Sequence, residues 1–541
     1  MTTNVSIDTL LTEIDEAVER GVLADALALS ISAVEMGIRD PIVLMLAAEH
    51  YEKIGRVSHA LQLLQQAASS DPNDAEVWRR MGGVMARSGM LESALAALRN
   101  SLEIEPDSYA TLVIAGAVSF QFGNLPAAND FYRRAASLSS QDTELMASIA
   151  LIAARLGNAD EARERGGQVL KADPASVNAH MAIARVDFLE GHAISAENRL
   201  TAMLARTDID DRNKIAILDL RAEARDSLNK TSDAFADYCA HNELLSRLYA
   251  QIARKAANER KVDQATRLAS YFDRVATWPS SAHDEEGNQT VKRHVFLLGF
   301  PRSGTTLLEK ALASHPDVVT LEEVDHLGAI GNQFLQTDEA LDRLASLSGA
   351  ALAPCREQYW LGVRQSLGAN IAGKIVVDKM PLHTPALPVI ARLFPSAKIM
   401  FALRDPRDVV LSCFRRRFRM NLAMFEFLTL RETALYYDGI MNLAKTYRKC
   451  LALDLLEVRH EAVVVNFDSE LRRVLQFVGA DWNPAVREFA KRARSHVRTP
   501  SDLQLTRGLS TAGLDQWRRY HAQMEPVLPI LAKWVSHFGY G

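Results

Sequence analysis

Glycine recurs every 34 residues across the first two hundred positions, and this period constrains the fold more than any other feature of the chain. The repeated glycines are Gly21, Gly55, Gly89, Gly123, Gly157 and Gly191. Five residues after them stand the alanines Ala26, Ala60, Ala94, Ala128, Ala162 and Ala196. Glycine suits a tight turn, and a small alanine lets two helices approach closely. Each unit is therefore predicted to be a helical hairpin that buries its apolar face by stacking on its neighbours.

A third repeated position, seventeen residues after four of the glycines, holds Pro72, Pro106, Ser140 and Pro174. Proline is tolerated in the first turn of a helix, so we expect it to open the next helix. A degenerate further unit is predicted around Asn229 and Ala234, at an offset of 38 residues from the last repeated glycine rather than 34.

This pattern resembles the tetratricopeptide repeat, whose period is 34, over roughly residues 5 to 207. The resemblance implies an all-α solenoid with a surface for a protein or peptide partner. Self-association, or packing without a separate ligand, is the alternative.

Composition limits the remaining possibilities. The chain has 541 residues, enough for two domains. Its 62 Lys and Arg against 67 Asp and Glu give a net charge of −5, which argues against a general nucleic-acid binder. We predict neither a secretion signal nor a membrane span, because no apolar run approaches 18 residues. The four cysteines show no disulfide spacing, so a cytoplasmic location is expected.

The glycine column stops near residue 250, and a polar, turn-rich stretch follows Trp278. We predict a helical repeat array over 1–250, a helical spacer and linker over 251–290, and a second domain over 291–541.

The second domain opens with an apolar run at 295–300, a loop at 301–306 and a helical pattern from Leu307. A strand, a glycine loop and a helix form a phosphate cradle, because N–H groups at the helix start face the anion. The spacing of Gly299 and Gly304 is that of a P-loop, but Thr305 stands where nucleotide triphosphatases have lysine. The cation is Arg302, inside the loop. Such a loop suits a 5′-phosphosulfate, which need not recruit Mg²⁺.

The loop Pro301-Arg-Ser-Gly-Thr-Thr306 resembles the 5′-phosphosulfate loop of sulfotransferases, and residues 307–323 resemble the tyrosylprotein sulfotransferase branch. A second block at 398–412, a strand followed by Arg404 and then Ser412, is similar to the family's 3′-phosphate motif. The resemblance covers about residues 290 to 541. It implies a P-loop-like α/β domain with a parallel sheet and 3′-phosphoadenosine 5′-phosphosulfate as co-substrate, with no metal required.

The resemblance also implies the cofactor-binding residues. They are Arg302, Ser303, Gly304, Thr305, Thr306, Arg404, Ser412, Arg416 and Arg507. An arginine fork and a hydroxyl can grip a phosphate, and ligands gather at the carboxyl ends of parallel strands. We expect the neighbouring Arg415 and Arg417 to lie on a solvated face.

Sulfuryl transfer needs a base for the acceptor hydroxyl and positive charge near the leaving oxygen. By resemblance the base is Glu323, with a helix-cap role as its alternative and His326 as the second candidate base. Lys379 lies in a third block, at 375–381, that resembles the family's strand ending in a catalytic lysine. By the same resemblance, Ser501 and Arg302 are the remaining catalytic candidates.

The chain departs from the family at several positions. Gln516 stands for a basic residue and His460 for a tyrosine, while Val324 and Asp325 replace a Thr and a substrate-binding Arg. An aspartate would repel an acidic peptide. The acceptor therefore stays open between a tyrosyl peptide and a small hydroxylated metabolite.

Two other functions remain. Asp378 can be interpreted as a Walker-B acid, which favours a Mg²⁺-dependent P-loop nucleotide kinase. A repeat scaffold with an inactive sulfotransferase-like domain is the third hypothesis.

Overall fold

In a computed structural model, the chain is described over residues 7–139, 141–258, 260–279, 291–368, 371–491 and 508–541. Its internal contacts divide it into two compact units, Met1–Arg199 and Leu200–Gly541.

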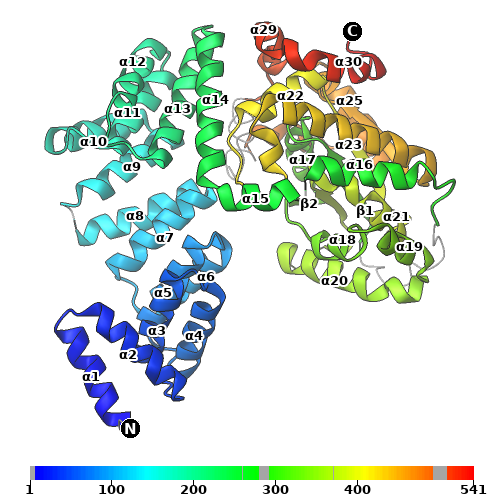
Figure 1. Ribbon diagram of the computed structural model, residues 1–541. Helices are drawn as coiled ribbons and strands as arrows, with labels where there is room; N and C mark the ends of the chain where they lie inside the picture. Colours follow the sequence, from blue (N-terminus) through cyan, green and yellow to red (C-terminus); the bar gives the residue numbers. More distant parts are fainter. Residues whose placement is uncertain (1–6, 140, 259, 280–290, 369–370, 492–507) are drawn as a thin grey trace. The chain divides into compact units, whose positions relative to one another are not determined.

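The first unit consists of consecutive helices, and each helix between residues 7 and 172 packs on the next, as predicted (Figure 1). They are α1 (Ile7–Glu19), α2 (Leu23–Glu35), α3 (Pro41–Lys53), α4 (Val57–Ser70), α5 (Ala75–Arg87), α6 (Leu91–Ile104), α7 (Tyr109–Phe122), α8 (Leu125–Leu138), α9 (Thr143–Leu156), α10 (Ala159–Ala172), α11 (Val177–Leu189) and α12 (Ala193–Leu204), the last of which crosses the unit boundary.

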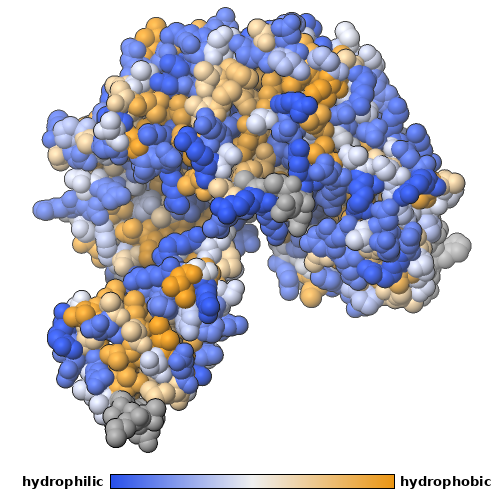
Figure 2. All heavy atoms as spheres, in the orientation of Figure 1, coloured by the Kyte–Doolittle hydropathy of each residue, from blue (hydrophilic) through white to orange (hydrophobic). Residues whose placement is uncertain are grey.

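The repeated glycines and alanines take the roles predicted for them. All six glycines lie in turns between paired helices with φ from 71° to 87°, a conformation that other residues adopt at a cost. All six alanines have 0% exposed surface. Several large apolar side chains of the first helices remain exposed, and Figure 2 shows apolar surface over this part of the unit.

The repeated prolines do not open helices, so that prediction is wrong. Helix α5 begins at Ala75 with Asp74 as its N-cap, three residues after Pro72. The side chain of Asp74 accepts the N–H groups that a helix start leaves unpaired, and the proline lies in the turn before it.

The degenerate unit forms a longer hairpin of α13 (Asp211–Ser227) and α14 (Thr231–Leu248). Asn229 takes the left-handed turn position with φ 60°, and Ala234 is fully buried. Asp237 is buried and pairs with Arg221 and Arg225 across the hairpin, at 2.6 and 2.9 Å. This hairpin belongs to the second compact unit.

The second unit contains a five-stranded sheet in the order β2-β3-β1-β4-β5, in which every pairing is parallel. The strands are β1 (Arg293–Gly299), β2 (Val318–Glu322), β3 (Ile375–Lys379), β4 (Lys398–Leu403) and β5 (Asp454–Arg459). The sequence-based fold class, an α solenoid followed by a parallel α/β domain, is confirmed.

Helices cover both faces of this sheet (Figure 1). The helices of the second unit that follow α14 are α15 (Ala250–Asn258), α16 (Lys261–Phe272), α17 (Thr305–Ala313), α18 (Gly328–Phe334), α19 (Asp338–Ser346), α20 (Gly349–Leu367), η1 (Pro381–Ala386), α21 (Leu387–Leu393), α22 (Pro406–Arg415), η2 (Met424–Phe427), α23 (Leu430–Cys450), α24 (His460–Val465), α25 (Phe467–Val478), η3 (Pro484–Glu488), η4 (Thr511–Gly513), α28 (Gln516–Arg519), α29 (His521–Met524), η5 (Glu525–Val527) and α30 (Leu528–His537).

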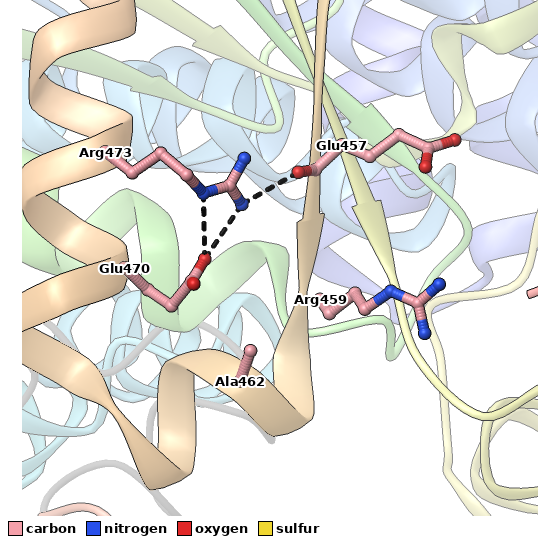
Figure 3. A pocket seen from close by; sticks show the side chains of 5 residues that line it. All are labelled: Glu457, Arg459, Ala462, Glu470 and Arg473. Atoms are coloured by element: carbon pink, nitrogen blue, oxygen red, sulfur yellow. Dashed lines mark hydrogen bonds and ion pairs between the residues drawn. The ribbon is translucent and has the colours of Figure 1, made fainter. Parts of the chain in front are cut away.

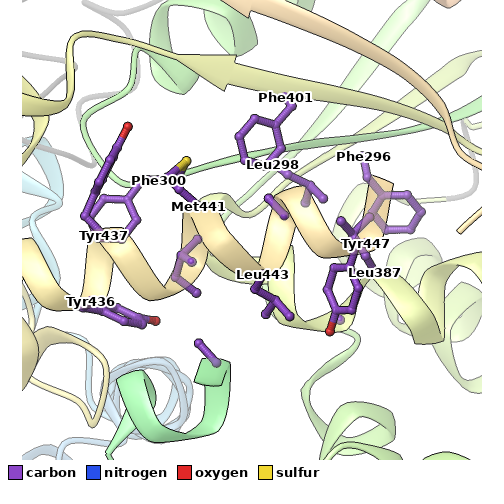
Figure 4. Close-up of a cluster of buried hydrophobic side chains, with 14 of the residues drawn as sticks. Phe296, Leu298, Phe300, Leu387, Phe401, Tyr436, Tyr437, Met441, Leu443 and Tyr447 are labelled. Atoms are coloured by element: carbon purple, nitrogen blue, oxygen red, sulfur yellow. The ribbon is translucent and has the colours of Figure 1, made fainter. Parts of the chain in front are cut away.

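Alternate residues of β1 point to two separate cores. Phe296 and Leu298 pack with the aromatic side chains of α23 on one face, among them Tyr437 (Figure 4). Val295 and Leu297 pack against α17 and α25 on the other face. Burial on both faces gives β1 its continuous apolar sequence.

The four cysteines are unpaired. Within the described residues, no helix combines the length and apolar character needed to cross a membrane.

Candidate active site

The glycine loop connects β1 to α17, as the sequence predicted. Gly299 has φ 151° and Gly304 has φ 93°, both open to glycine and strained for other residues. A Cβ atom on Gly299 would lie 2.8 Å from the carbonyl of Ala402, and one on Gly304 would lie 2.4 Å from Nδ1 of His460. The loop backbone is thus held where only glycine fits, at the N-terminus of a nine-residue helix that favours an anion. The next residues of the motif, Ser303, Thr305 and Thr306, are buried beside these glycines.

Arg302 connects the glycine loop to the block at 398–412, called the second motif below. Its backbone has φ 69°, a strained conformation for an arginine. Its Nε donates to Ser412 Oγ at 3.0 Å, and its carbonyl accepts from Nη1 of Arg404 at 3.1 Å. The thiol of Cys413 donates to the carbonyl of Pro301 at 3.3 Å. The two sequence blocks that resemble nucleotide motifs therefore lie together.

Positive charge is crowded at this place. Burial, followed by the charges of Arg416 and Arg404, lowers the pKa of Arg302 to about 9. Burial, followed by the charges of Arg404 and Arg302, lowers the pKa of His460 to about 3. Among the described residues, Arg404 Nε and His460 Nδ1 are buried without a hydrogen-bond partner. An anion would relieve the repulsion and give the Nε–H of Arg404 a partner, so the residues fit a phosphorylated nucleotide.

Arg404 is fixed from behind by the C-terminal segment. Its Nη2 donates to the carbonyl of Gly513 and lies 3.5 Å from Asp408 Oδ2. Asp408 Oδ1 accepts the backbone N–H of Trp517 at 2.9 Å, and Arg407 stacks on the Trp517 ring at 4.0 Å. The tail containing Trp517 thus packs on the second motif.

Glu323 and Lys379 form an ion pair at the carboxyl ends of β2 and β3, with Nζ and Oε1 2.7 Å apart. The backbone N–H of Glu323 donates to the carbonyl of Lys379, and Glu323 has φ 54°. The Lys379 side chain is fully buried, whereas that of Glu323 is 44% exposed. Burial opposes the charge of Lys379, but the carboxylates of Glu323, Glu309 and Glu322 outweigh it and raise its pKa. A buried cation thus lies beside an accessible carboxylate in a strained conformation, and Glu323 does not cap a helix.

The acids next to this pair have other partners. Glu322 bonds to Lys310 through both of its oxygens at 3.0 Å, so it turns away from Glu323. Asp378 is fully buried and accepts from the hydroxyl of Tyr359 at 2.8 Å. Burial raises the pKa of Asp378 to about 6. One oxygen of Asp378 is therefore held by Tyr359 in the aromatic core, which weakens the case for interpreting this residue as a metal ligand.

The second candidate base, His326, contacts a different group. Its Nε2 lies 3.0 Å from Ser366 Oγ, and burial lowers its pKa. Asp325 lies 3.0 Å from His383 Nε2 and accepts the N–H of Gly328. Burial opposes the charge of Asp325, but these contacts outweigh it and lower its pKa. A carboxylate therefore stands two residues from Glu323.

The arginine run after Ser412 meets acids of α13. Arg416 Nη1 lies 3.0 Å from Glu223 Oε1, and Arg415 Nη1 lies 3.3 Å from Asp226 Oδ2. The Arg415 side chain is only 11% exposed, so the expectation of a solvated face is wrong for it, because a carboxylate neutralises its charge. Arg417 is exposed, as expected.

Two predicted site residues, Ser501 and Arg507, lie outside the described residues, so their roles stay predictions. Gln516, noted as a departure from the family, donates to the carbonyl of Ala512 and does not face Arg404.

Sequence reasoning missed the carboxylates of α13 and the position of His460 over the loop. Asp219, Glu223 and Asp226 are spaced four and three residues apart, which places them on one face of a helix. That polar stripe was the available signal. For His460, no local pattern indicates a contact with a loop more than 150 residues away.

A cavity of about 420 Å³ lies elsewhere, at the edge strand β5, and is lined by Glu457, Arg459, Ala462, Glu470 and Arg473. Figure 3 shows Arg473 donating to Glu470 and to the carbonyl of Glu457. The two glutamates and two arginines that line this cavity neutralise one another, and none of the predicted site residues lines it.

Comparisons with known proteins agree with this geometry. Residues 294–484 match the model of the Sulfotransferase family, and residues 43–153 match that of the middle TPR-like domain of cilia and flagella-associated protein 70. A protein-tyrosine sulfotransferase of Drosophila melanogaster is 25% identical over 298 residues, covering 50% of this chain and 58% of the fly protein. Protein-tyrosine sulfotransferase 1 of Danio rerio is 25% identical over 266 residues, covering 46% of this chain and 72% of the fish protein.

An uncharacterised protein of Aquifex aeolicus is 27% identical over 248 residues, covering 44% of this chain and 32% of its own length. The chain thus spans about a third of the Aquifex protein and somewhat over half of the fly enzyme. Among solved structures, a tetratricopeptide repeat protein from Parabacteroides merdae is 15% identical with a TM-score of 0.36, covering 44% of this chain and 93% of that one. The C-terminal half of the chain thus contains a region, residues 294–484, that matches the Sulfotransferase family model, and a tetratricopeptide-like repeat region precedes it.

Proposed function

We propose that the C-terminal domain transfers the sulfuryl group of 3′-phosphoadenosine 5′-phosphosulfate to an acceptor hydroxyl. The observation that carries this proposal is the convergence of Arg302, Arg404 and Ser412, which come from two distant motifs and leave a buried guanidinium N–H without a partner. The bound co-substrate supplies the sulfuryl group, and its 5′-phosphate is the leaving group.

The residues of this chain divide the work. The loop N–H groups and Arg302 hold the 5′ side of the nucleotide, and Arg404 with Ser412 holds its 3′-phosphate. Glu323 takes the proton of the acceptor hydroxyl as the new oxygen–sulfur bond forms. The ammonium of Lys379 stabilises the charge on the bridging oxygen as the old sulfur–oxygen bond breaks. Their ion pair keeps the base and the cation within reach of one reacting centre.

A Mg²⁺-dependent kinase has less support. Thr305 stands in place of the lysine that a triphosphate needs, and Asp378 is engaged by Tyr359. The third hypothesis, an inactive domain, is disfavoured because the base, the lysine and the cationic motif are all present together.

The acceptor is proposed to be a phenolic hydroxyl, such as that of a tyrosyl peptide, or a small hydroxylated metabolite. Protein-tyrosine sulfotransfer is the activity for which the fly and fish relatives are named. The carboxylate of Asp325 disfavours an acidic peptide next to the target hydroxyl. The repeats are proposed to bind the acceptor, a protein partner or a second copy of the chain, in a cytoplasmic setting. Exposed apolar side chains on the first helices support such a surface.

The nucleotide assignment is tested by calorimetry with 3′-phosphoadenosine 5′-phosphate in buffer without Mg²⁺. Arg302→Ala and Arg404→Ala should each weaken binding about 10- to 100-fold, the effect of losing a charge-assisted contact. Arg473→Ala is the matched control, because this arginine serves the separate cavity at β5. Unchanged affinity in both site variants, or binding of ATP only with Mg²⁺, would overturn the assignment.

The acceptor is tested by transfer of a ³⁵S label from the donor to a panel of four probes. The panel holds tyrosyl peptides with basic, neutral and acidic flanks, and a simple phenol. We expect transfer to the basic and neutral members and little to the acidic one. Preference for the acidic peptide would contradict the role given to Asp325.

A further inference from the structure

The hairpin α13–α14 is part of the catalytic unit and not a freely exposed end of the repeats. Ala222, Ala234 and Tyr238 of this hairpin lie in the same buried cluster as Phe296 of the central strand. The amide of Asn242 is buried and donates to the carbonyl of Phe414, at 3.1 Å. The hairpin therefore contacts α22, the helix that carries Ser412.

Arg416 stands between this hairpin and the nucleotide motifs. It is the C-cap residue of α22, four residues after Ser412, whose hydroxyl accepts from Arg302. Its Nη1 bonds to Glu223 Oε1 of α13 at 3.0 Å, and both side chains are about three quarters buried. One edge of the guanidinium is thus held by the hairpin.

The charge of Arg416 reaches the nucleotide site. After burial, it is the largest influence among those that lower the pKa of Arg302, ahead of Arg404. A long arginine side chain loses much rotamer freedom when it is held in one geometry. A carboxylate that holds one edge before the ligand arrives removes part of that cost from binding.

We propose that Glu223 is a positioning residue that orients Arg416 toward the nucleotide bound by Arg302 and Arg404, so that the hairpin preceding the catalytic domain sets part of its nucleotide affinity. This rests on the proposed nucleotide site. Glu223 aids nucleotide binding by holding Arg416, because a carboxylate does not itself bind a phosphate. Asp226 has a different task, since it joins Arg415 to Tyr520 and thereby fastens the hairpin to the C-terminal segment.

The test is a double-mutant cycle on the full-length chain, with binding of 3′-phosphoadenosine 5′-phosphate measured by calorimetry. Arg416→Ala should weaken binding about 10- to 100-fold, as expected for a charge-assisted contact. Glu223→Ala should weaken it about 3- to 10-fold, as expected when an ordered side chain becomes mobile. The double variant should bind no more weakly than Arg416→Ala, because Glu223 has no route of its own to the ligand.

Two further variants separate positioning from loosening of the hairpin. Glu223→Gln keeps an oxygen acceptor for Arg416 and should recover most of the affinity that Glu223→Ala loses. Ser232→Ala removes a hydrogen bond to Gln523 in the same interface and should leave affinity unchanged. Additive losses in the double variant, or a Glu223→Ala protein that binds as well as or better than wild type, would overturn the inference. A wild-type protein that binds no nucleotide would instead overturn the proposed function.

Discussion

Replacing Glu323 by glutamine tests the chemistry of the site most directly. The change keeps the shape of the side chain and an acceptor for Lys379, but the amide cannot take a proton. We expect kcat to fall by roughly 10² to 10⁴, the usual contribution of a general base. At about 1.4 kcal/mol per tenfold change, this is about 3 to 6 kcal/mol of activation free energy.

The structure predicts that stability changes much less. The ion pair joins a buried ammonium to a carboxylate whose side chain is 44% exposed, so solvent screens part of the attraction. Glutamine keeps an oxygen acceptor for the buried ammonium, so the hydrogen bond survives and only its ionic part is lost. The carboxylates of Glu309 and Glu322 continue to favour the charge of Lys379. Glu323→Gln should therefore unfold at nearly the wild-type denaturant concentration and should bind 3′-phosphoadenosine 5′-phosphate normally.

The assay is single-turnover transfer of ³⁵S label to the best acceptor of the panel, together with two comparison variants. Lys379→Ala should lower kcat by about 10² to 10³ and also loosen the nucleotide, since it removes a preorganised cation. His326→Gln should stay within a few-fold of wild type, because His326 bonds to Ser366 and not to the reacting centre. If His326→Gln abolishes turnover while Glu323→Gln remains active, the base is the histidine and the reasoning is refuted.

Three other predictions follow from burial and backbone geometry. The pKa of Asp378 is raised from 3.8 to about 6, so the buried carboxylate lowers the stability of the protein as pH rises through this window. The free energy of unfolding of Asp378→Asn should exceed that of wild type by about 3 kcal/mol at pH 7.5 and by little at pH 4, as measured by denaturant unfolding. Gly304→Ala should abolish nucleotide binding in calorimetry, because its Cβ meets His460 and its φ is 93°; normal binding would contradict the loop geometry. A protein that starts at residue 200 should be soluble and bind nucleotide, whereas one that starts at 250 should aggregate in size-exclusion chromatography; a soluble, binding-competent 250 variant would contradict the shared core.

The local elements could be predicted because their signals are local. The glycine and alanine columns specify turns and close helix contacts within one repeat, and the loop between Gly299 and Gly304 has its strand and helix directly beside it. The prolines were misplaced because the same residue suits both a first helical turn and the turn before it, and the capping Asp74 decides between the two. The limits of the three predicted domains stay a prediction.

The contact between Glu323 and Lys379 depends on strand order, which the sequence does not display. The two residues are 56 positions apart and meet because β2 pairs with β3, in the register that sets Glu322 opposite Lys379. Family resemblance supplied both residues without their contact. The turn of Glu322 toward Lys310 likewise depends on which face of β2 lies against α17, and adjacent residues of a strand point to opposite faces.

The hairpin α13–α14 shows that a repeat pattern alone does not display which helices also pack on the sheet domain. Its turn residue and its buried alanine follow the repeat, so the sequence assigns it to the array. In the array a hairpin needs only neighbours to cover its apolar face, but α13 also carries the acidic stripe of Asp219, Glu223 and Asp226. Three partly buried acids on one helix face require cations, and the cluster around Arg415 and Arg416 supplies them. The same arginines lie near other positive charges at the glycine loop. The acids of α13 and the arginines at the end of α22 therefore neutralise one another. Charge complementarity between the acidic stripe of α13 and the arginines at the end of α22 is therefore the sequence signal that indicates this contact.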